Sequence, residues 1–196
     1  MTKVAVIYYS STGTNYTMAQ AVAEGAREAG ADVRVRIVRE TDPEEVVNAQ
    51  PHWRDFAEKV KDEPRATPDD VEWADAIVFG TPTRFGNVSC QLKAFIDSLV
   101  GLWFQGKLAD KVYAGFTSAK NPNGGQEATL LSLYTSVYHF GGIVVTPGYG
   151  DPVVFAAGGN PYGPSVTTIG PPTENDLGHA KFLGRRVTQF AGKIRA

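Results

Sequence analysis

The chain has 196 residues, of which 42% are hydrophobic, and a formal net charge of −2. This length suits one domain with a full core, so we expect residues 1–196 to form a single domain. The weak charge argues against a nucleic-acid partner, which favours a basic surface, and against the strongly acidic surface of a small electron carrier that docks on basic proteins.

The cysteine content and the apolar runs indicate the compartment. Cys90 is the only cysteine, so an internal disulfide is excluded and a reducing compartment is the default. The N-terminal residues lead directly into a strand pattern without a signal peptide, and the apolar runs are too short to cross a membrane. We therefore expect a cytoplasmic protein without a transmembrane segment.

Strand and helix patterns alternate along the chain. Apolar runs rich in β-branched and aromatic residues predict strands, and apolar residues at helical spacing predict amphipathic helices. A Thr-Glu-Asn-Asp capping box opens the last helix. In chain order, the patterns predict a strand at 4–9, a helix at 16–29, strands at 33–38 and 76–80, a helix at 91–100, a strand at 112–118, a helix at 127–139, a strand at 142–147 and a helix at 173–192.

This alternation predicts an α/β fold. We expect a doubly wound, five-stranded parallel sheet in the order 2-1-3-4-5, with helices on both faces. Two stretches interrupt the alternation: residues 41–72, with four prolines and many charges, and residues 147–172, rich in proline and glycine. Neither has a hydrophobic period of its own, so we expect irregular functional loops or interfaces there rather than further domains.

Hydrogen-bonding residues crowd the loop between the first strand and the first helix, SSTGTN at residues 10–15. In an open α/β sheet the ligand lies beyond the carboxyl ends of the strands, and a helix N-terminus there offers free N–H groups to a phosphate. The ATP-type P-loop and the dinucleotide G-x-G-x-x-G pattern are absent. The loop therefore predicts a site for the phosphate of FMN. The alternative is an ordinary capped turn, because Ser, Thr and Asn all cap helices.

Two further polar loops follow the third and fourth strands: GTPTRFGNVS at residues 80–89 and TSAKNPNGGQ at residues 117–126. Both loops lie at the carboxyl ends of their strands, at the same edge of the predicted sheet as the first loop. We therefore expect the three loops to converge on one crevice. Phe85 either lies against an isoalloxazine ring or plugs the core. Arg84 either bonds a flavin carbonyl or an anionic hydroquinone, or forms a surface ion pair. Cys90 is expected to be a small buried packing residue.

With these motifs in hand, the chain resembles the flavodoxin-like NAD(P)H:quinone oxidoreductases of the WrbA type (tryptophan-repressor-binding-protein-like). The resemblance covers nearly the whole length, and its most specific stretch is GTPTRFGNVSCQLKAFID. It implies a flavodoxin-like fold and an FMN-bound enzyme, usually a tetramer, that passes two electrons from NAD(P)H to quinones. The other matching segments are YYSSTGTNYTMAQAVAEGA, GLWFQGKLADK, GGQE, YHFG and NPYGPSV followed by Thr167, Thr168 and Ile169.

The resemblance also implies roles for residues of this chain. It assigns His139 a place near the flavin and Trp103 a place beside the substrate of a neighbouring subunit. The first loop departs from many relatives, because Thr12 stands where they carry an aromatic residue that helps to hold the nucleotide. The implied cofactor contacts are Ser10, Ser11, Thr12, Gly13, Thr14 and Asn15 in the first loop, Pro82, Thr83, Arg84, Phe85, Gly86 and Asn87 in the second, Ser118, Ala119, Lys120, Asn121 and Gly124 in the third, and His139.

A ping-pong reaction at one shared site follows from these roles. His139 then bonds the flavin edge or relays a proton, or is only a cation at a helix end. Trp103 either forms a stacking wall or covers its own core. We expect no metal site, because the other histidines and the carboxylates at residues 69–75 lack ligand spacing. The alternatives to an enzyme are a flavodoxin-like electron carrier and a regulatory partner protein with a vestigial cofactor site.

Overall fold

The computed structural model describes residues 1–167 and 170–195, so Thr168 and Ile169 of the C-terminal motif lie outside the described residues. The strands are β1 (Lys3–Tyr8), β2 (Asp32–Ile37), β3 (Ala76–Pro82), β4 (Val112–Ala119), β5 (Ile143–Val144) and β6 (Ser165–Thr167). The helices are α1 (Thr14–Glu28), α2 (Glu44–Asn48), α3 (Pro51–Lys59), α4 (Pro68–Trp73), α5 (Cys90–Asp97), α6 (Val100–Phe104), α7 (Gln126–Phe140), α8 (Pro152–Ala156) and α9 (Glu174–Ile194).

The strands form a parallel sheet in the order β2-β1-β3-β4-β5, which confirms the predicted order. The prediction of five strands is one short. β5 pairs with Val112 and Tyr113 only, and β6 pairs with β4 farther along, from Thr117 to Ala119. Because β4 is longer than β5, its backbone groups near the carboxyl end need a second partner, and residues 165–167 provide it.

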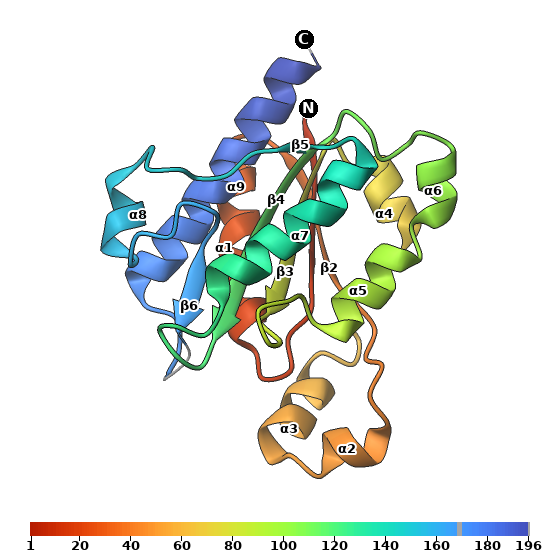
Figure 1. Cartoon of the computed structure of the whole chain (residues 1–196), viewed down its shortest axis with the longest axis vertical. Helices are drawn as coiled ribbons and strands as arrows, with labels where there is room; N and C mark the ends of the chain where they lie inside the picture. The colour runs from red at the N-terminus through yellow and green to blue at the C-terminus, as the bar shows by residue number, and fades with distance from the viewer. Residues whose placement is uncertain (168–169, 196) are drawn as a thin grey trace.

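Helices cover both faces of this sheet (Figure 1). Successive residues of β1 point to opposite faces, as the period of a strand requires. Val4 and Val6 belong to the core cluster that contains residues of α1 and α9, whereas Ala5 and Ile7 belong to the cluster that contains residues of α5 and α7. The continuous apolar run of the first strand is therefore explained by burial on two sides.

The stretch at residues 41–72, predicted to be irregular, contains three short helices. Pro51 and Pro68 stand at the first positions of α3 and α4, where the missing N–H group of proline has no cost. Thr67 and Asp70 form a capping box at the start of α4. These helices have only five to nine residues, which is too short to display a hydrophobic period. Likewise, the stretch at residues 147–172 contains α8 and β6.

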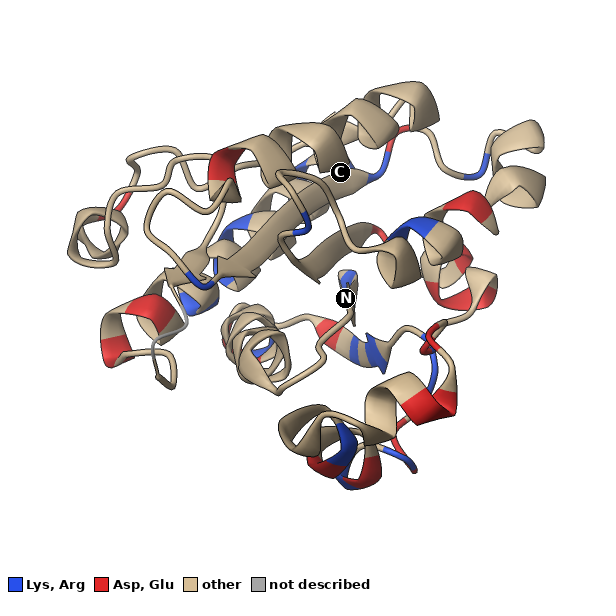
Figure 2. Cartoon of the chain, turned by 60° about the horizontal axis from the view of Figure 1, so that its bottom comes forward, with Lys and Arg blue, Asp and Glu red and all other residues tan. Residues whose placement is uncertain are grey.

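Helices α2 and α3 form a lobe beyond the carboxyl ends of the strands, at the bottom of Figure 1. Basic and acidic positions are interspersed over the ribbon in Figure 2, in line with the weak net charge. Within residues 1–167 and 170–195, no helix is long and apolar enough to cross a bilayer. The expectation of one domain stays a prediction.

Helices α1 and α9 pack closely because each contributes a glycine to their contact. A Cβ atom on Gly25 would lie 2.0 Å from the carbonyl oxygen of Lys181, and a Cβ atom on Gly184 would lie 2.0 Å from that of Val22. Carbonyl groups inside helices cannot move aside without loss of their hydrogen bonds. The approach of the two helices therefore depends on the absence of a side chain at both positions.

We predict that Gly184→Ala lowers the free energy of unfolding by about 1–3 kcal/mol, because the added methyl group overpacks this contact. The matched control is Gly192→Ala on the same helix, where the added Cβ atom meets only the Thr2 hydroxyl, at 3.4 Å. The control should be neutral or stabilising by up to about 1 kcal/mol. Urea unfolding measures both. Equal stability of the Gly184 variant and the parent would contradict the close approach.

Candidate flavin site

The first loop presents an uncapped helix N-terminus at the carboxyl end of β1. Gly13 precedes α1 in the left-handed conformation, with φ of 99°, and no side chain of the described residues caps the helix. The Ser10 hydroxyl accepts a hydrogen bond from the Gly13 N–H at 3.0 Å, which closes the loop but leaves the first turn of α1 free. The alternative of an ordinary capped turn therefore fails for this helix.

Asn15 has a different place from the one predicted. Its side chain is buried, and one hydrogen of the Nδ2 amide donates to the carbonyl oxygen of Tyr9 at 3.2 Å, so at most one amide hydrogen remains for a ligand. The Oδ1 atom is buried without a partner among the described residues. A buried orphan acceptor is costly, and it suits a hydroxyl donor next to the phosphate. Ser11, Thr12 and Thr14 remain at least partly accessible.

The second loop is a tight turn with Phe85 at its tip. Arg84 and Asn87 exchange backbone hydrogen bonds of 2.8 and 3.0 Å, and Phe85 and Gly86 between them have φ of 53° and 77°. Two positive φ values in succession are typical of a type I′ turn. The Phe85 side chain is fully exposed, so the alternative that it plugs the core is wrong. Holding a phenylalanine in this conformation costs on the order of 1 kcal/mol.

The third loop lies against the second. The Thr83 N–H donates to the carbonyl oxygen of Ser118 at 2.8 Å, and a Cβ atom on Gly125 would lie 3.0 Å from the Cα atom of Gly86. Gly124 donates its N–H to the carbonyl oxygen of Asn121 at 3.0 Å, which closes the third loop. Glycine is needed at position 125 because the backbones of the second and third loops meet there. Ala119 is buried, and Lys120 is exposed.

A backbone hydrogen bond also joins the start of the first loop to the end of β3. The Tyr9 N–H donates to the carbonyl oxygen of Gly80 at 2.9 Å, where Gly80 belongs to β3 just before the second loop. Pro82, the last residue of β3, is paired with Ser118 of β4. The three polar loops therefore follow adjacent strands at one edge of the sheet, as the strand order predicts.

His139 and Trp103 lie together, but they do not lie with the three loops. The Trp103 indole N–H donates to the carbonyl oxygen of His139 at 2.9 Å, and both residues line a pocket of about 370 Å³ between α5, α6 and α7. α7 begins beside the third loop and rises about 1.5 Å per residue, so His139 is on the order of 20 Å from its first turn. The Trp103 side chain is 47% exposed, so it is not a core residue.

No sequence pattern singled out Glu40, which follows β2 and forms hydrogen bonds with three other parts of the chain. Its carboxylate accepts hydrogen bonds from the Tyr9 hydroxyl at 2.7 Å, from the Trp53 indole at 3.1 Å and from the Gln91 amide at 2.7 Å. Burial opposes its ionisation, but the hydrogen bonds prevail and lower the pKa of Glu40. Burial and this carboxylate raise the pKa of Tyr9. A charged residue at the carboxyl edge of the sheet was the available signal.

Cys90 also differs from its prediction. It begins α5 after the cap residue Ser89, whose hydroxyl accepts from the Leu92 N–H at 3.3 Å. The cysteine is exposed rather than buried, because apolar residues at α5 positions such as Leu92 and Phe95 face the core.

Comparison with known proteins decides the family. A sequence profile described as NADPH-dependent FMN reductase matches residues 2–150. The chain belongs to the NADPH-dependent FMN reductase family.

Two similar proteins match nearly the whole of this chain and nearly the whole of their own length. An NAD(P)H dehydrogenase (quinone) of Deinococcus radiodurans is 52% identical over 193 residues, which cover 98% of this chain and 96% of that protein. Another, of Archaeoglobus fulgidus, is 42% identical over 99% of this chain and 100% of its own length. The resemblance stated from the sequence motifs is thereby confirmed.

Solved structures agree with the fold. The WrbA-like flavodoxin of Agrobacterium tumefaciens is similar with a TM-score of 0.71 and 29% identity, over 98% of this chain and 99% of that one. A flavodoxin from the domain Archaea has a TM-score of 0.61 at 21% identity, over 99% of each chain, and shows the shared fold alone. The flavodoxin-like fold class is confirmed.

FMN is the cofactor that the family and the flavodoxin-like structure indicate. The donor set of the first loop fits it, because free N–H groups at a helix N-terminus suit a phosphate. The orphan Oδ1 acceptor of Asn15 suits a ribityl hydroxyl. No lysine or arginine belongs to residues 10–15, so the phosphate would be held by neutral donors and the helix dipole.

We predict that Thr14→Val weakens FMN binding by about 10- to 150-fold, because a hydrogen bond to a charged group is worth about 1.5–3 kcal/mol. Among the described residues the Thr14 hydroxyl has no hydrogen-bond partner, so its loss should spare the fold. Thr17→Val is the matched control, because its hydroxyl already donates to the Gly13 carbonyl at 3.2 Å. Fluorescence titration of apoprotein with FMN measures both affinities. Equal affinities in the two variants would remove Thr14 from the phosphate site.

Proposed function

We propose that the protein is an FMN-dependent NAD(P)H dehydrogenase (quinone) that reduces quinones by two electrons. The single observation that carries the cofactor part is the uncapped N-terminus of α1 behind Gly13. The names of full-length relatives supply the two substrates. When bound, FMN accepts a hydride from a nicotinamide and delivers two electrons to a quinone.

In this proposal the residues of the chain bind FMN and orient its ring. The free N–H groups of the first turn of α1 hold the phosphate, and Asn15 Oδ1 accepts from a ribityl hydroxyl. The turn at Arg84 to Asn87 presents backbone groups to the ring, and Phe85 provides an exposed aromatic face beside it. With one crevice for both substrates, the nucleotide leaves before the quinone enters, which makes the reaction ping-pong.

The two alternative functions differ in what they require. An electron carrier needs FMN but no substrate site, and the flavodoxin-like fold alone fits it. A regulatory partner needs neither. The exposed Trp103 and the weak net charge favour an enzyme, because a carrier has no substrate that needs an aromatic wall. Cytoplasmic localisation stays a prediction that rests on the single cysteine.

The purified protein tests the function directly. We expect flavin absorption bands, NADH or NADPH oxidation that depends on added benzoquinone, and parallel lines in double-reciprocal plots of initial rates. Flavin bands without quinone-dependent oxidation would favour the carrier, and a protein that binds no FMN would favour the regulatory partner. Intersecting lines would reject the ping-pong order but not the enzyme.

We also propose that Trp103 and His139 serve the flavin of a neighbouring subunit. The resemblance assigns His139 a place near the flavin and Trp103 a place beside the substrate. Yet His139 lies on the order of 20 Å from the first turn of α7 in one chain, and Trp103 is hydrogen-bonded to it. Their surroundings are unusually apolar for a free surface, which is typical of an interface. The exposed apolar residues on α6, α7 and the start of β5 are Val100, Trp103, Phe104, Leu131, Tyr138 and Ile143. We therefore expect a dimer or tetramer.

Trp103→Ala tests this assignment. A wall that stacks on the quinone contributes about 0.5–1.5 kcal/mol beyond area burial, so the KM for quinone should rise about 2- to 13-fold. FMN content should equal that of the parent, because the three loops are untouched. Steady-state kinetics and sedimentation measure the effect and the assembly. A protein that sediments as a monomer at nanomolar concentration and keeps full quinone reductase activity would contradict a quinone site built from two subunits.

A further inference from the structure

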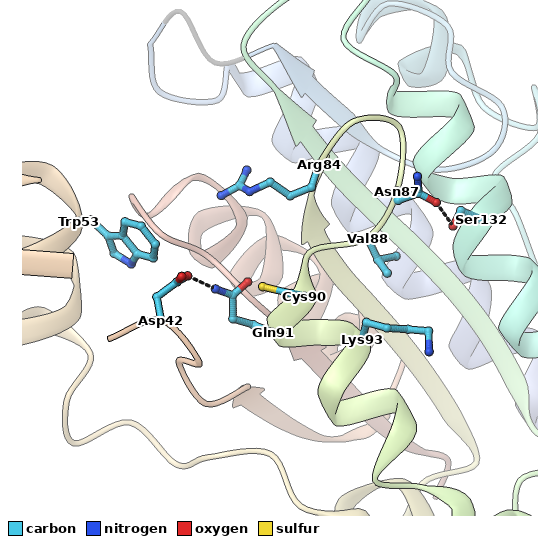
Figure 3. A pocket seen from close by; sticks show the side chains of 9 residues that line it. All are labelled: Asp42, Trp53, Arg84, Asn87, Val88, Cys90, Gln91, Lys93 and Ser132. Carbon is cyan, nitrogen blue, oxygen red and sulfur yellow. Dashed lines mark hydrogen bonds between the residues drawn. The ribbon is translucent and has the colours of Figure 1, made fainter. Parts of the chain in front are cut away.

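A pocket of about 590 Å³ borders the second loop on the side that faces α3 (Figure 3). Arg84 of the second loop and Trp53 of α3 lie on two of its sides, and Cys90 and Gln91 at the start of α5 lie on a third. No residue of the first or third loop lines it. We call this space the Trp53 pocket. Its size is typical of a small-molecule site.

Trp53 is held in place by two contacts of its helix. The indole N–H donates to Glu40 Oε2 at 3.1 Å. Phe56, three residues later on the same face of α3, lies against the first loop, because a Cβ atom on Gly13 would be 3.3 Å from its ring. α3 is thus fixed to the cofactor loop, and the Trp53 ring is oriented beside it before any ligand arrives.

The pocket contains a cation without a carboxylate partner. Among the described residues, no carboxylate lies within 4.0 Å of the Arg84 guanidinium, which donates only to the carbonyl oxygen of its neighbour Thr83, at 3.2 Å. The alternative of a surface ion pair therefore fails for the described residues. In Figure 3 the Arg84 side chain extends toward the side of the pocket where Trp53 lies.

The carboxylates near this cation are already engaged. Asp42 accepts a hydrogen bond from the Gln91 amide at 2.7 Å, and Glu40 accepts from the same amide and from Trp53. Lys93, at another edge of the pocket, pairs with Asp97 one turn along α5. What the pocket offers a ligand is therefore a fixed aromatic ring and a guanidinium with free donors. A planar base attached to a phosphate matches both groups.

We propose that the Trp53 pocket binds the adenosine phosphate portion of the nicotinamide nucleotide, with adenine against the Trp53 ring and a phosphate at Arg84. This inference rests on the proposed function. The nicotinamide must lie over the flavin beside the second loop, and Arg84 belongs both to that loop and to the pocket. The rest of the dinucleotide then reaches the pocket without crossing the sheet.

A binding measurement that involves no turnover tests the pocket first. Cys90 is the only cysteine, is exposed and lines the pocket, so its alkylation by iodoacetamide reports occupancy. In the FMN-loaded protein, saturating ADP-ribose, 5′-AMP or 2′-AMP should slow alkylation at least about threefold, whereas ribose 5-phosphate, which lacks the ring, should not. Trp53→Ala should abolish the protection. Unchanged alkylation with all three adenosine phosphates would overturn the proposal.

Kinetics of Trp53 variants test the same site during turnover. A base stacked on an aromatic ring contributes enough that Trp53→Ala should raise the KM for NADH and NADPH about tenfold, with the KM for benzoquinone unchanged. Trp53→Phe keeps a ring and should stay within about threefold of the parent. Melting temperature and FMN content are measured for both variants, so that an effect of unfolding is told apart from loss of the stacking ring. A change in the KM for benzoquinone alone would overturn the proposal.

Trp73→Ala is the matched control, because Trp73 is a second half-buried tryptophan on a short helix, α4, and lies outside the pocket. Its ring packs against the Arg34 guanidinium at 4.0 Å, so the variant is expected to lose stability and keep the nucleotide KM. An equal rise in the nucleotide KM in both alanine variants would assign the effect to stability. If the parent protein does not oxidise NAD(P)H, the proposed function is wrong. The alkylation result still decides whether the pocket binds adenosine phosphates.

Discussion

The complete burial of β1, β3 and β4 is the constraint on which the rest of the structure depends. Every residue of β3 and β4 is buried, and so is all of β1 after Lys3. Strands covered on both faces leave the ends of the sheet as the places where polar groups reach solvent. The parallel arrangement sends all three carboxyl ends to one edge. The polar loops that follow these strands are adjacent for that reason, and the N-terminus of α1 opens among them.

The lobe of α2 and α3 acts on this edge through a few fixed contacts. Glu40 ties Tyr9, Trp53 and Gln91 together, so the ends of the first two strands and the starts of two helices share one carboxylate. Phe56 packs edge-on with Tyr16 of α1, with ring centroids 5.9 Å apart. The lobe is therefore part of the frame around the cofactor loops. A segment anchored in this way can line a ligand pocket with little loss of entropy on binding.

The three polar loops lie at the carboxyl ends of the strands, whereas Trp103 and His139 lie at the far end of α7. The hydrogen bond between the Trp103 indole and the His139 carbonyl keeps these two residues together at the end of α7. A carbonyl at a helix C-terminus needs a partner, so the contact has a local structural role whatever the assembly. The exposed aromatic rings around it have no such local role, and the proposed contact with a second subunit would account for them.

The sequence by itself determined the strand order, the fold class and the three polar loops, because these depend on local periodicity and on rules of chain connection. It also carried the family motifs. Only the tertiary structure decided that Phe85 is exposed, that Cys90 faces solvent and that the Asn15 amide bonds to Tyr9. Each of these depends on which atoms surround a side chain. The partners of Glu40 come from positions as far as 51 residues away, and no local pattern encodes a contact at that separation.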